Sequence, residues 1–385
     1  MKATFAVEEL NKRLQQMAAV ISKNAAMPIL GFVRLEVIGE TATLTGADAA
    51  AYIKTALKAT EVDSPFSILL PFGRFSEIVS KLSGQAVTIM LGPDGNANIA
   101  AGRYRGVLRT RGVAEFVPIP AFEGDQVVSI ALDPFQAAAK RISPIVPDAG
   151  GKYIAAVAQL EITEGALKVI ATDGYQLGII TLPGEFTAAD PLLLPKPALE
   201  LVQKLTGKTL AITQGEAGFF FSTDTEVLYI GKVQGEFPPY QRIIPTNTIT
   251  QVKVTSEAFK EALARIQATT DEETPIVTIE ATENGSLLSL SSVNQEVGFG
   301  NEDVEVETNG SAIIFMLNSN YLAGFIGEVK GIFLMNITAA NKVVDFTAEE
   351  GRFRYLLMPS APPAPKAEGE EKPEGKKAKK EKAAA

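Results

Sequence analysis

The chain has 385 residues, a formal net charge of −9 and 46% hydrophobic residues, which is enough apolar material for several domains with cores of their own. It contains no histidine and no cysteine, which excludes Ser-His-Asp and Cys-His nucleophiles, imidazole bases, disulfides and the usual zinc sites. No apolar run is long enough to span a bilayer, and no secretory signal or phosphate-binding glycine loop is evident, so we expect a cytoplasmic protein that uses no nucleotide.

The first predicted helix, over residues 8–24, begins a pattern that occurs three times. Its apolar residues follow the spacing that places them on one face of a helix: Leu10, Leu14, Met17 and Ile21. The same spacing recurs, after offsets of 125 and 124 residues, in helices predicted over 133–147 and 256–268. A second apolar-striped helix follows in each repeat, over 73–84, 195–207 and 318–331.

Short alternating or β-branched runs surround these helices and predict strands. The runs cover residues 33–45, 86–91, 97–110, 160–171, 209–212, 219–233, 276–290 and 343–358. Each helix must bury one face against a sheet, which predicts an α+β fold with the helices on one side and three such units in an arc. The expected domains are residues 1–123, 124–247 and 248–360.

The stretch 168–180 sets the middle repeat apart. Asp173-Gly174 joins two apolar runs, and Asp-Gly in that setting predicts a β-hairpin because glycine tolerates positive φ. The equivalent positions in the other repeats are Asp48-Ala49 and Asn294-Gln295. The Asp-Gly-Tyr tip is therefore unique to the middle repeat.

The last 25 residues, 361–385, contain no apolar residue larger than Ala or Pro, so we expect a disordered tail. Removing the tail's charge of +2 leaves −11 for the rest of the chain. Within that part the six predicted helices carry +4 and the remainder −15. Such a division would let a helix-lined face approach phosphate while the sheet face repels it, although ordinary solvated helix faces would look the same.

Five short motifs occur in order along the chain: Met27-Pro28-Ile29-Leu30, Leu44-Thr45-Gly46-Ala47-Asp48, Ala171-Thr172-Asp173-Gly174-Tyr175-Gln176-Leu177, Gly235-Glu236-Phe237-Pro238-Pro239-Tyr240-Gln241-Arg242 and Tyr355-Leu356-Leu357-Met358-Pro359. With these motifs on a threefold repeat, the chain resembles the bacterial DNA polymerase III beta subunits, the sliding clamps, over residues 1 to about 360.

The resemblance implies a head-to-tail homodimer that closes a ring around duplex DNA, with helices lining the hole and sheets outside. A clamp that slides should attract phosphate weakly and read no bases. The family implies no catalytic activity, metal or cofactor. As a class, the implied DNA-facing residues are Lys12, Arg13, Lys23, Arg74, Lys81, Lys140, Arg141, Lys196, Lys204 and Lys260.

In the family, short peptides from the polymerase III catalytic subunit, the clamp loader, other polymerases and repair proteins dock between the second and third domains. The matching positions are Tyr153, Ile154, Thr172, Gly174, Tyr175, Gln176, Leu177, Pro238, Arg242, Ile243, Leu356 and Met358. The alternative is that Gly174 serves only a turn and that Leu177 and Met358 are core residues.

Three features depart from the family pattern. Tyr175-Gln176 stands where a basic pair is common. At the implied dimer interface, Gly106 replaces an aromatic residue beside Leu108, and Ala268-Thr269 replaces bulky aliphatic residues. The tail follows directly behind a strand of the peptide pocket.

Two other functions remain open from the sequence. A carboxylate hydrolase would need two acidic residues in one cleft, and no such pair stands out in the repeat. A non-replicative scaffold with the same fold would bind partner peptides without serving the replicase.

Overall fold

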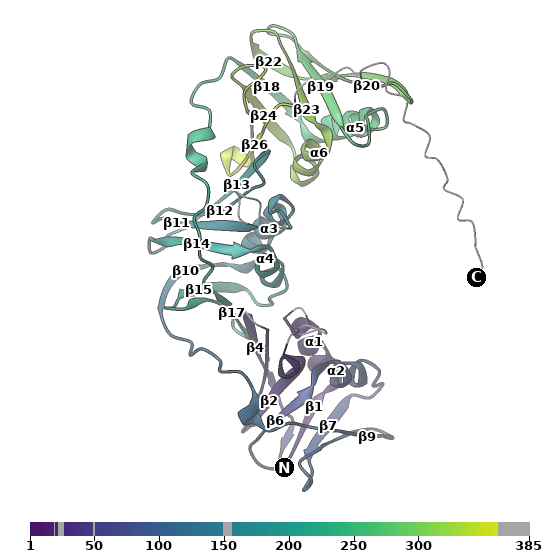
Figure 1. The fold of residues 1–385 in the computed structure, drawn as a ribbon, viewed down its shortest axis with the longest axis vertical. Helices are drawn as coiled ribbons and strands as arrows, with labels where there is room; N and C mark the ends of the chain where they lie inside the picture. The colour runs from purple at the N-terminus through teal and green to yellow at the C-terminus, as the bar shows by residue number, and fades with distance from the viewer. Residues whose placement is uncertain (19, 22–26, 49–50, 149–155, 361–385) are drawn as a thin grey trace, which may run out of the picture.

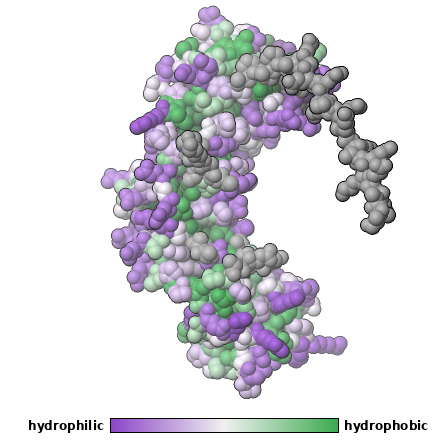
Figure 2. Space-filling model, viewed as in Figure 1, coloured by the Kyte–Doolittle hydropathy of each residue, from purple (hydrophilic) through white to green (hydrophobic). Residues whose placement is uncertain are grey.

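The computed structural model describes residues 1–18, 20–21, 27–48, 51–148 and 156–360, which form a crescent of three lobes (Figure 1). The helices lie along the concave side of the crescent and the sheets form its convex side. Figure 2 shows the molecule hollowed on the concave side. The predicted α+β arc with helices on one side is confirmed.

Two helices belong to each lobe, and all six predicted helices form. They are α1 (Val7–Met17), α2 (Phe72–Ser80), α3 (Leu132–Ile142), α4 (Lys196–Val202), α5 (Ser256–Gln267) and α6 (Ser319–Glu328). All six are shorter than predicted. For example, α3 ends at Ile142 because Ser143-Pro144 begins a 3-10 turn, and proline lacks the N–H that would continue the α-helix. The predicted apolar stripes are buried, with Leu10, Phe135 and Phe259 fully inaccessible.

Two sheets extend across lobe boundaries. The eight-stranded sheet between the first and second lobes runs in the order β10 (Asp125–Ala131), β15 (Thr209–Gln214), β16 (Gly218–Ser222), β17 (Glu226–Gly231), β4 (Ala51–Lys58), β3 (Thr41–Ala47), β2 (Phe32–Ile38) and β6 (Phe66–Pro71). The nine-stranded sheet between the second and third lobes runs in the order β14 (Ala189–Pro195), β11 (Val157–Ile162), β12 (Ala166–Thr172), β13 (Gln176–Pro183), β26 (Phe353–Leu357), β25 (Val344–Ala348), β24 (Ile332–Ile337), β18 (Thr250–Thr255) and β22 (Glu307–Gly310).

Two smaller sheets lie at the ends of the crescent. In the first lobe the order is β5 (Glu61–Val62), β1 (Lys2–Ala6), β7 (Ala86–Leu91), β8 (Ala97–Ala101) and β9 (Tyr104–Leu108). In the third lobe it is β21 (Gly298–Glu305), β20 (Leu287–Asn294), β19 (Ile276–Ala281) and β23 (Ile313–Asn318). Within the described part of the chain, β9 and β21 each have one edge without a partner strand.

Both lobe junctions are formed by antiparallel pairing between a strand of one lobe and a strand of the next. Strand β17 of the second lobe pairs antiparallel with β4 of the first, and β26 of the third pairs antiparallel with β13 of the second. The expected domain boundaries, after residues 123 and 247, fall in the segments that connect β9 to β10 and β17 to β18. The three lobes therefore share sheets although their chain segments follow one another.

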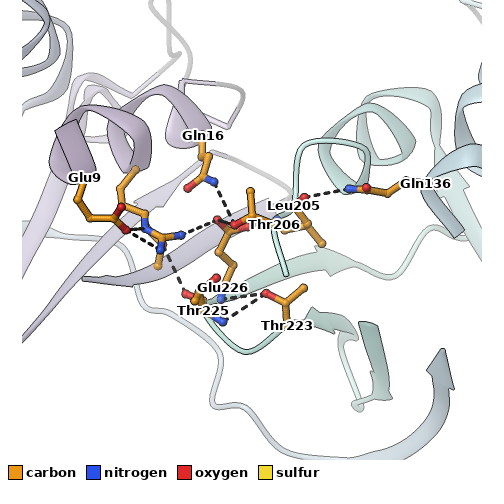
Figure 3. A network of polar contacts seen from close by, with 10 residues as sticks. Glu9, Gln16, Gln136, Leu205, Thr206, Thr223, Thr225 and Glu226 are labelled. Atoms are coloured by element: carbon orange, nitrogen blue, oxygen red, sulfur yellow. Dashed lines mark hydrogen bonds and ion pairs between the residues drawn. The ribbon is translucent and has the colours of Figure 1, made fainter. Parts of the chain in front are cut away.

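A buried ion pair holds the first junction on its helix side (Figure 3). Arg13 of α1 is 7% exposed, and its Nη1 lies 3.1 Å from Oε1 of Glu226, which begins β17 and is 2% exposed. Glu9 also binds Arg13, with 2.7 Å between Oε1 and Nη2. Thr206 donates to Glu226 from both its backbone N and its Oγ1, at 2.9 Å each. Arg13 was predicted to face DNA, and this is wrong because burial and two carboxylates commit its guanidinium to the junction.

Replacing one partner of this ion pair leaves the other charge buried without compensation. We expect Arg13→Ala to lower the free energy of unfolding by about 3 to 5 kcal/mol, measured by urea denaturation. Arg74→Ala, which removes only an exposed pair with Glu77, should change it by less than about 1 kcal/mol. Equal midpoints for the two variants would show that the buried pair does not support the junction.

Candidate functional site

The hairpin between β12 and β13 is held in shape by its own side chains. Asp173 Oδ1 accepts hydrogen bonds from the backbone N of Tyr175 and of Gln176, both at 2.9 Å. Thr172 Oγ1 donates to the Gln176 carbonyl at 2.7 Å and accepts from Gly174 N at 3.1 Å. Gly174 has φ of +93°, so the predicted need for glycine at this turn is confirmed. Tyr175 is left exposed at the tip.

Strand β26 of the third lobe lies beside this tip. Met358 N donates to the Tyr175 carbonyl at 2.9 Å, which places an exposed methionine next to the exposed tyrosine. Tyr355 Oη donates to Gln176 Oε1 at 2.6 Å, and burial raises the pKa of Tyr355 well above its usual value, so the phenol stays a hydrogen-bond donor. Both lobes therefore contribute to one surface at their junction.

The segment before β18 packs onto the outer face of this junction. Tyr240, in the short 3-10 turn Tyr240–Ile243, is buried in a cluster with Leu177 and Leu356, and Phe237 and Ile244 border it. Tyr240 Oη donates to Glu161 Oε2 at 2.7 Å, and Lys168 Nζ lies 2.6 Å from Glu161 Oε1. Burial raises the pKa of Glu161, but the hydrogen bonds from Lys168 and Tyr240 outweigh it and hold the pKa below its usual value. The carboxylate thus fixes the connecting segment at neutral pH.

The structure sorts the predicted peptide-site residues into three groups. The exposed ones are Gly174, Tyr175, Arg242, Ile243 and Met358, with Gln176 and Pro238 partly exposed. Thr172, Leu177 and Leu356 are buried, so the two leucines form the floor beneath Tyr240 and offer no surface of their own. Tyr153 and Ile154 lie outside the described residues. Sequence reasoning omitted Phe237 and Tyr240 from the site, although aromatic residues in a proline-rich connection are a packing signal.

The helices present a set of basic side chains to the concave side. Among the described residues, the ammonium groups within 4 Å of no carboxylate include those of Lys12, Lys140, Lys204 and Lys260, all on exposed residues. Arg74 and Lys81 are exposed but share Glu77, whose pKa is lowered first by the hydrogen bond from Lys81. Lys23 lies outside the described residues.

Two other predicted DNA-facing residues bind carboxylates instead. Arg141 Nη1 lies 2.8 Å from Glu349 Oε1, its guanidinium carbon is 5.5 Å from the centre of the Phe353 ring, and its side chain is largely buried. It therefore joins the second and third lobes much as Arg13 joins the first two. Lys196 Nζ lies 2.6 Å from Asp148 Oδ1, which neutralises part of its charge.

The residues expected at a dimer interface lie at the two ends of the crescent. Gly106 and Leu108 are on β9, and a Cβ built on Gly106 would lie 2.3 Å from Tyr104 Oη, so the Tyr104 ring occupies that space. Ala268 and Thr269 follow α5. Thr269 points inward, with its Oγ1 2.6 Å from Ser292 Oγ.

Comparison with known proteins gives a consistent result over the whole described chain. Models of the N-terminal and C-terminal domains of the DNA polymerase III beta subunit match residues 1–120 and 241–360. A beta sliding clamp of Pseudomonas aeruginosa is 26% identical over 372 residues, covering 93% of this chain and 99% of the relative. One from Escherichia coli is 24% identical over 370 residues with the same coverage.

Solved structures show the same fold. The DNA polymerase III beta subunit of Pseudomonas aeruginosa has a TM-score of 0.86 at 24% identity and covers 94% of this chain and 100% of its own. The beta subunit of Streptococcus pyogenes DNA polymerase has a TM-score of 0.87 at 19% identity with the same coverage.

The packing of Tyr240 on the junction can be tested by truncation. Tyr240→Ala removes a buried ring and should lower the free energy of unfolding by about 3 to 5 kcal/mol. Tyr240→Phe keeps the ring and loses the hydroxyl's hydrogen bond to the charged Glu161, so we expect a loss of about 1.5 to 3 kcal/mol. Gln234→Ala, at an exposed position earlier in the same connecting segment, is the control for urea denaturation. A Tyr240→Ala variant as stable as the control would show that the connection is not anchored there.

Proposed function

Because the chain belongs to the DNA polymerase III beta subunit family, we propose that it is a sliding clamp that encircles duplex DNA and tethers the replicative polymerase. It acts as a processivity factor without catalysis of its own and without a cofactor. The lack of cysteine suits the reducing cytoplasm, where we expect it to work. The observation that carries the proposal is a crescent with helices on its concave side and an open strand edge at each end.

The two open edges favour closure by a second copy in head-to-tail order. At each internal junction an edge strand contributed by one lobe pairs with an edge strand contributed by the next lobe, as β17 does with β4. Strands β9 and β21 hold the corresponding positions at the ends of the crescent. Their charges are opposite: Arg103, Arg105 and Arg109 accompany β9, whereas Asp303 and Glu305 lie on β21, where Glu302 is already paired with Arg265 of its own chain. Two copies joined in this way would give a closed ring of six lobes.

The concave side suits contact with DNA of any sequence. Lysine ammonium groups on flexible side chains attract phosphate as point charges and read no base edges. Lys12, Lys140 and Lys260 occupy one helix in each lobe, so a ring would present them at intervals around the hole. Among the described residues the positive charge of this side is reduced, because Arg13, Arg141 and Lys196 are engaged by carboxylates.

The junction between the second and third lobes suits partner peptides. Exposed Tyr175 and Met358 lie side by side there, and Arg242 and Ile243 follow on the connecting segment. We propose that peptides from the polymerase III catalytic subunit, the clamp loader, other polymerases and repair proteins bind at this surface. Its apolar side chains would take the anchors of an extended peptide.

The ring can be tested by its hold on DNA. A topological link involves no counterion release, whereas charge-driven binding through six to ten phosphates loses about 10³ to 10⁵ in affinity between 50 and 200 mM salt. We expect loaded protein to stay on nicked circular DNA in high salt during gel filtration and to leave when the circle is linearised. A monomer at micromolar concentration by native mass spectrometry, with no retention on circles, would contradict the proposal.

The peptide surface can be tested by calorimetry with a peptide that carries Leu and Phe anchors. Tyr175→Ala and Met358→Ala should each weaken binding by about 1 to 3 kcal/mol, since both side chains are exposed at the junction. Lys81→Ala, on the helix side, should bind like the parent. Unchanged affinity for both junction variants, or an equal loss for Lys81→Ala, would show that peptides bind elsewhere.

A further inference from the structure

On the outer face of each sheet that two lobes share, residues paired across successive strands form a row. Equivalent positions in the three lobes allow these rows to be compared residue by residue. In every lobe the first helix donates a backbone hydrogen bond to the residue before the return strand: Val7 to Gln85, Leu132 to Lys208 and Ser256 to Gly331. Five residues beyond these carbonyls lie Met90, Thr213 and Asn336. These three residues therefore occupy equivalent positions at the start of each row.

The two complete rows place a large, buried pair at the junction. The first runs through Thr213, Phe220, Tyr229, Tyr52 and Ala47. The second runs through Asn336, Asp345, Leu356, Leu177 and Thr172. The pairs that cross the lobe boundary are Tyr229 with Tyr52, whose rings stack at 5.1 Å, and Leu356 with Leu177.

The third row is divided between the two ends of the crescent. Met90 pairs with Asn98, which pairs with Val107 on β9. At the other end Val293 pairs with Phe299 on β21. Four of these five side chains are apolar and exposed: Met90 by 43%, Val107 by 62%, Val293 by 80% and Phe299 by 80%. The equivalent pairs at the internal junctions are at most 8% exposed.

We propose that Val107 of one copy and Phe299 of a second copy form the cross-strand pair at the ring closure, so that the outer face holds the apolar contact between subunits. This rests on the head-to-tail ring of the proposed function. Phe299 then packs on Val107, beside a hollow of about 350 Å³ that Val107 lines with Met90, Asn98 and Arg105. The occupant of the exposed apolar edge is thus another copy of this chain.

The same register explains the small residues on the helix side of the closure. It places Gly300 opposite Gly106, where the internal junctions have Ile53 opposite Leu228 and Gly178 opposite Tyr355. A Cβ on Gly300 would lie 2.5 Å from Thr269 Oγ1, so each glycine is covered by its own chain, by Tyr104 or by Thr269. Two facing glycines contribute no side-chain contact across the closure, and Leu108, the next helix-side residue of β9, would face Gly298. The larger apolar contact therefore lies on the outer face.

The register places one opposite-charge pair across the closure. Counting outward from the Val107 and Phe299 pair, Arg103 faces Asp303 and Arg105 faces Asn301. A slip of two residues would instead place Arg105 opposite Asp303 and Arg103 opposite Glu305, so the alignment of the rows, and not charge, selects the register. A slip of one residue would set Phe299, which its own sheet holds on the outer face, opposite a residue of β9 that points to the helix side, so the two sheets could not continue each other with their helices on one side.

Cysteine cross-linking tests the register directly, because the chain has no cysteine of its own. Val107→Cys with Phe299→Cys should give covalent dimers in high yield after mild oxidation, read on a denaturing gel. Directly opposite residues lie within disulfide range, whereas a diagonal pair about 7 to 8 Å apart does not. Val107→Cys with Asn301→Cys is the matched control and should yield few dimers.

Substitution tests how much the Phe299 side chain contributes to dimer affinity. Phe299→Ser should raise the dimer dissociation constant at least about tenfold by sedimentation velocity, since each closure loses a buried aromatic side chain. Ile314→Ser, which changes another exposed apolar residue on the outer face of the same sheet, should leave the dissociation constant unchanged. A monomeric parent would overturn the ring together with this pair. A dimeric parent whose Val107 and Phe299 cysteines fail to link, or whose Phe299→Ser variant dimerises normally, would overturn the pair alone.

Discussion

Main-chain hydrogen bonding between strands of different lobes is the constraint on which the crescent depends. If the lobes were separate, β4 and β13 would end their sheets with unpaired N–H and C=O groups, which invite pairing with another chain. Instead β17 and β26 complete these sheets through five paired residues each. The lobes cannot rotate against one another without breaking these ladders, so strand pairing fixes the curvature.

Side chains then secure the two faces of each junction by different means. On the helix side, buried ion pairs such as Arg13 with Glu226 fix how the lobes meet, since a misplaced lobe would leave a charge without its partner. On the outer side, the connecting segments add aromatic residues: Phe122 packs edge-on against Phe220 at 5.0 Å, and Tyr240 covers Leu177 and Leu356. The second junction leaves Tyr175 and Met358 exposed beyond Tyr240, and these two side chains form the surface proposed to bind peptides.

Periodicity in the sequence predicted the parts of the fold that local chemistry determines. Apolar spacing predicted six helices and their buried faces, and Asp173-Gly174 predicted the hairpin with its positive φ at glycine. Periodicity could not predict the sheets that span two lobes, because they depend on pairs such as Tyr52 with Tyr229, which lie far apart in the chain. For the same reason the sequence could not distinguish Lys12, which remains exposed, from Arg13, which reaches a carboxylate more than two hundred residues away. Leu177 belonged to the predicted site, but its burial depends on Tyr240 from a later segment.

The connecting segments have a mechanical consequence for a ring built from two such crescents. Each junction inside a crescent is spanned by continuous chain, so separating its sheets would also require peeling off the segment that carries Phe122 or Tyr240. At the joints between two crescents no peptide chain connects the two sides, and only the paired edge strands of the two copies hold them together. Under an outward pull they would fail before any other joint. A ring of this construction therefore has two predetermined points of opening, and a molecule that must admit a strand of DNA without unfolding needs such a point.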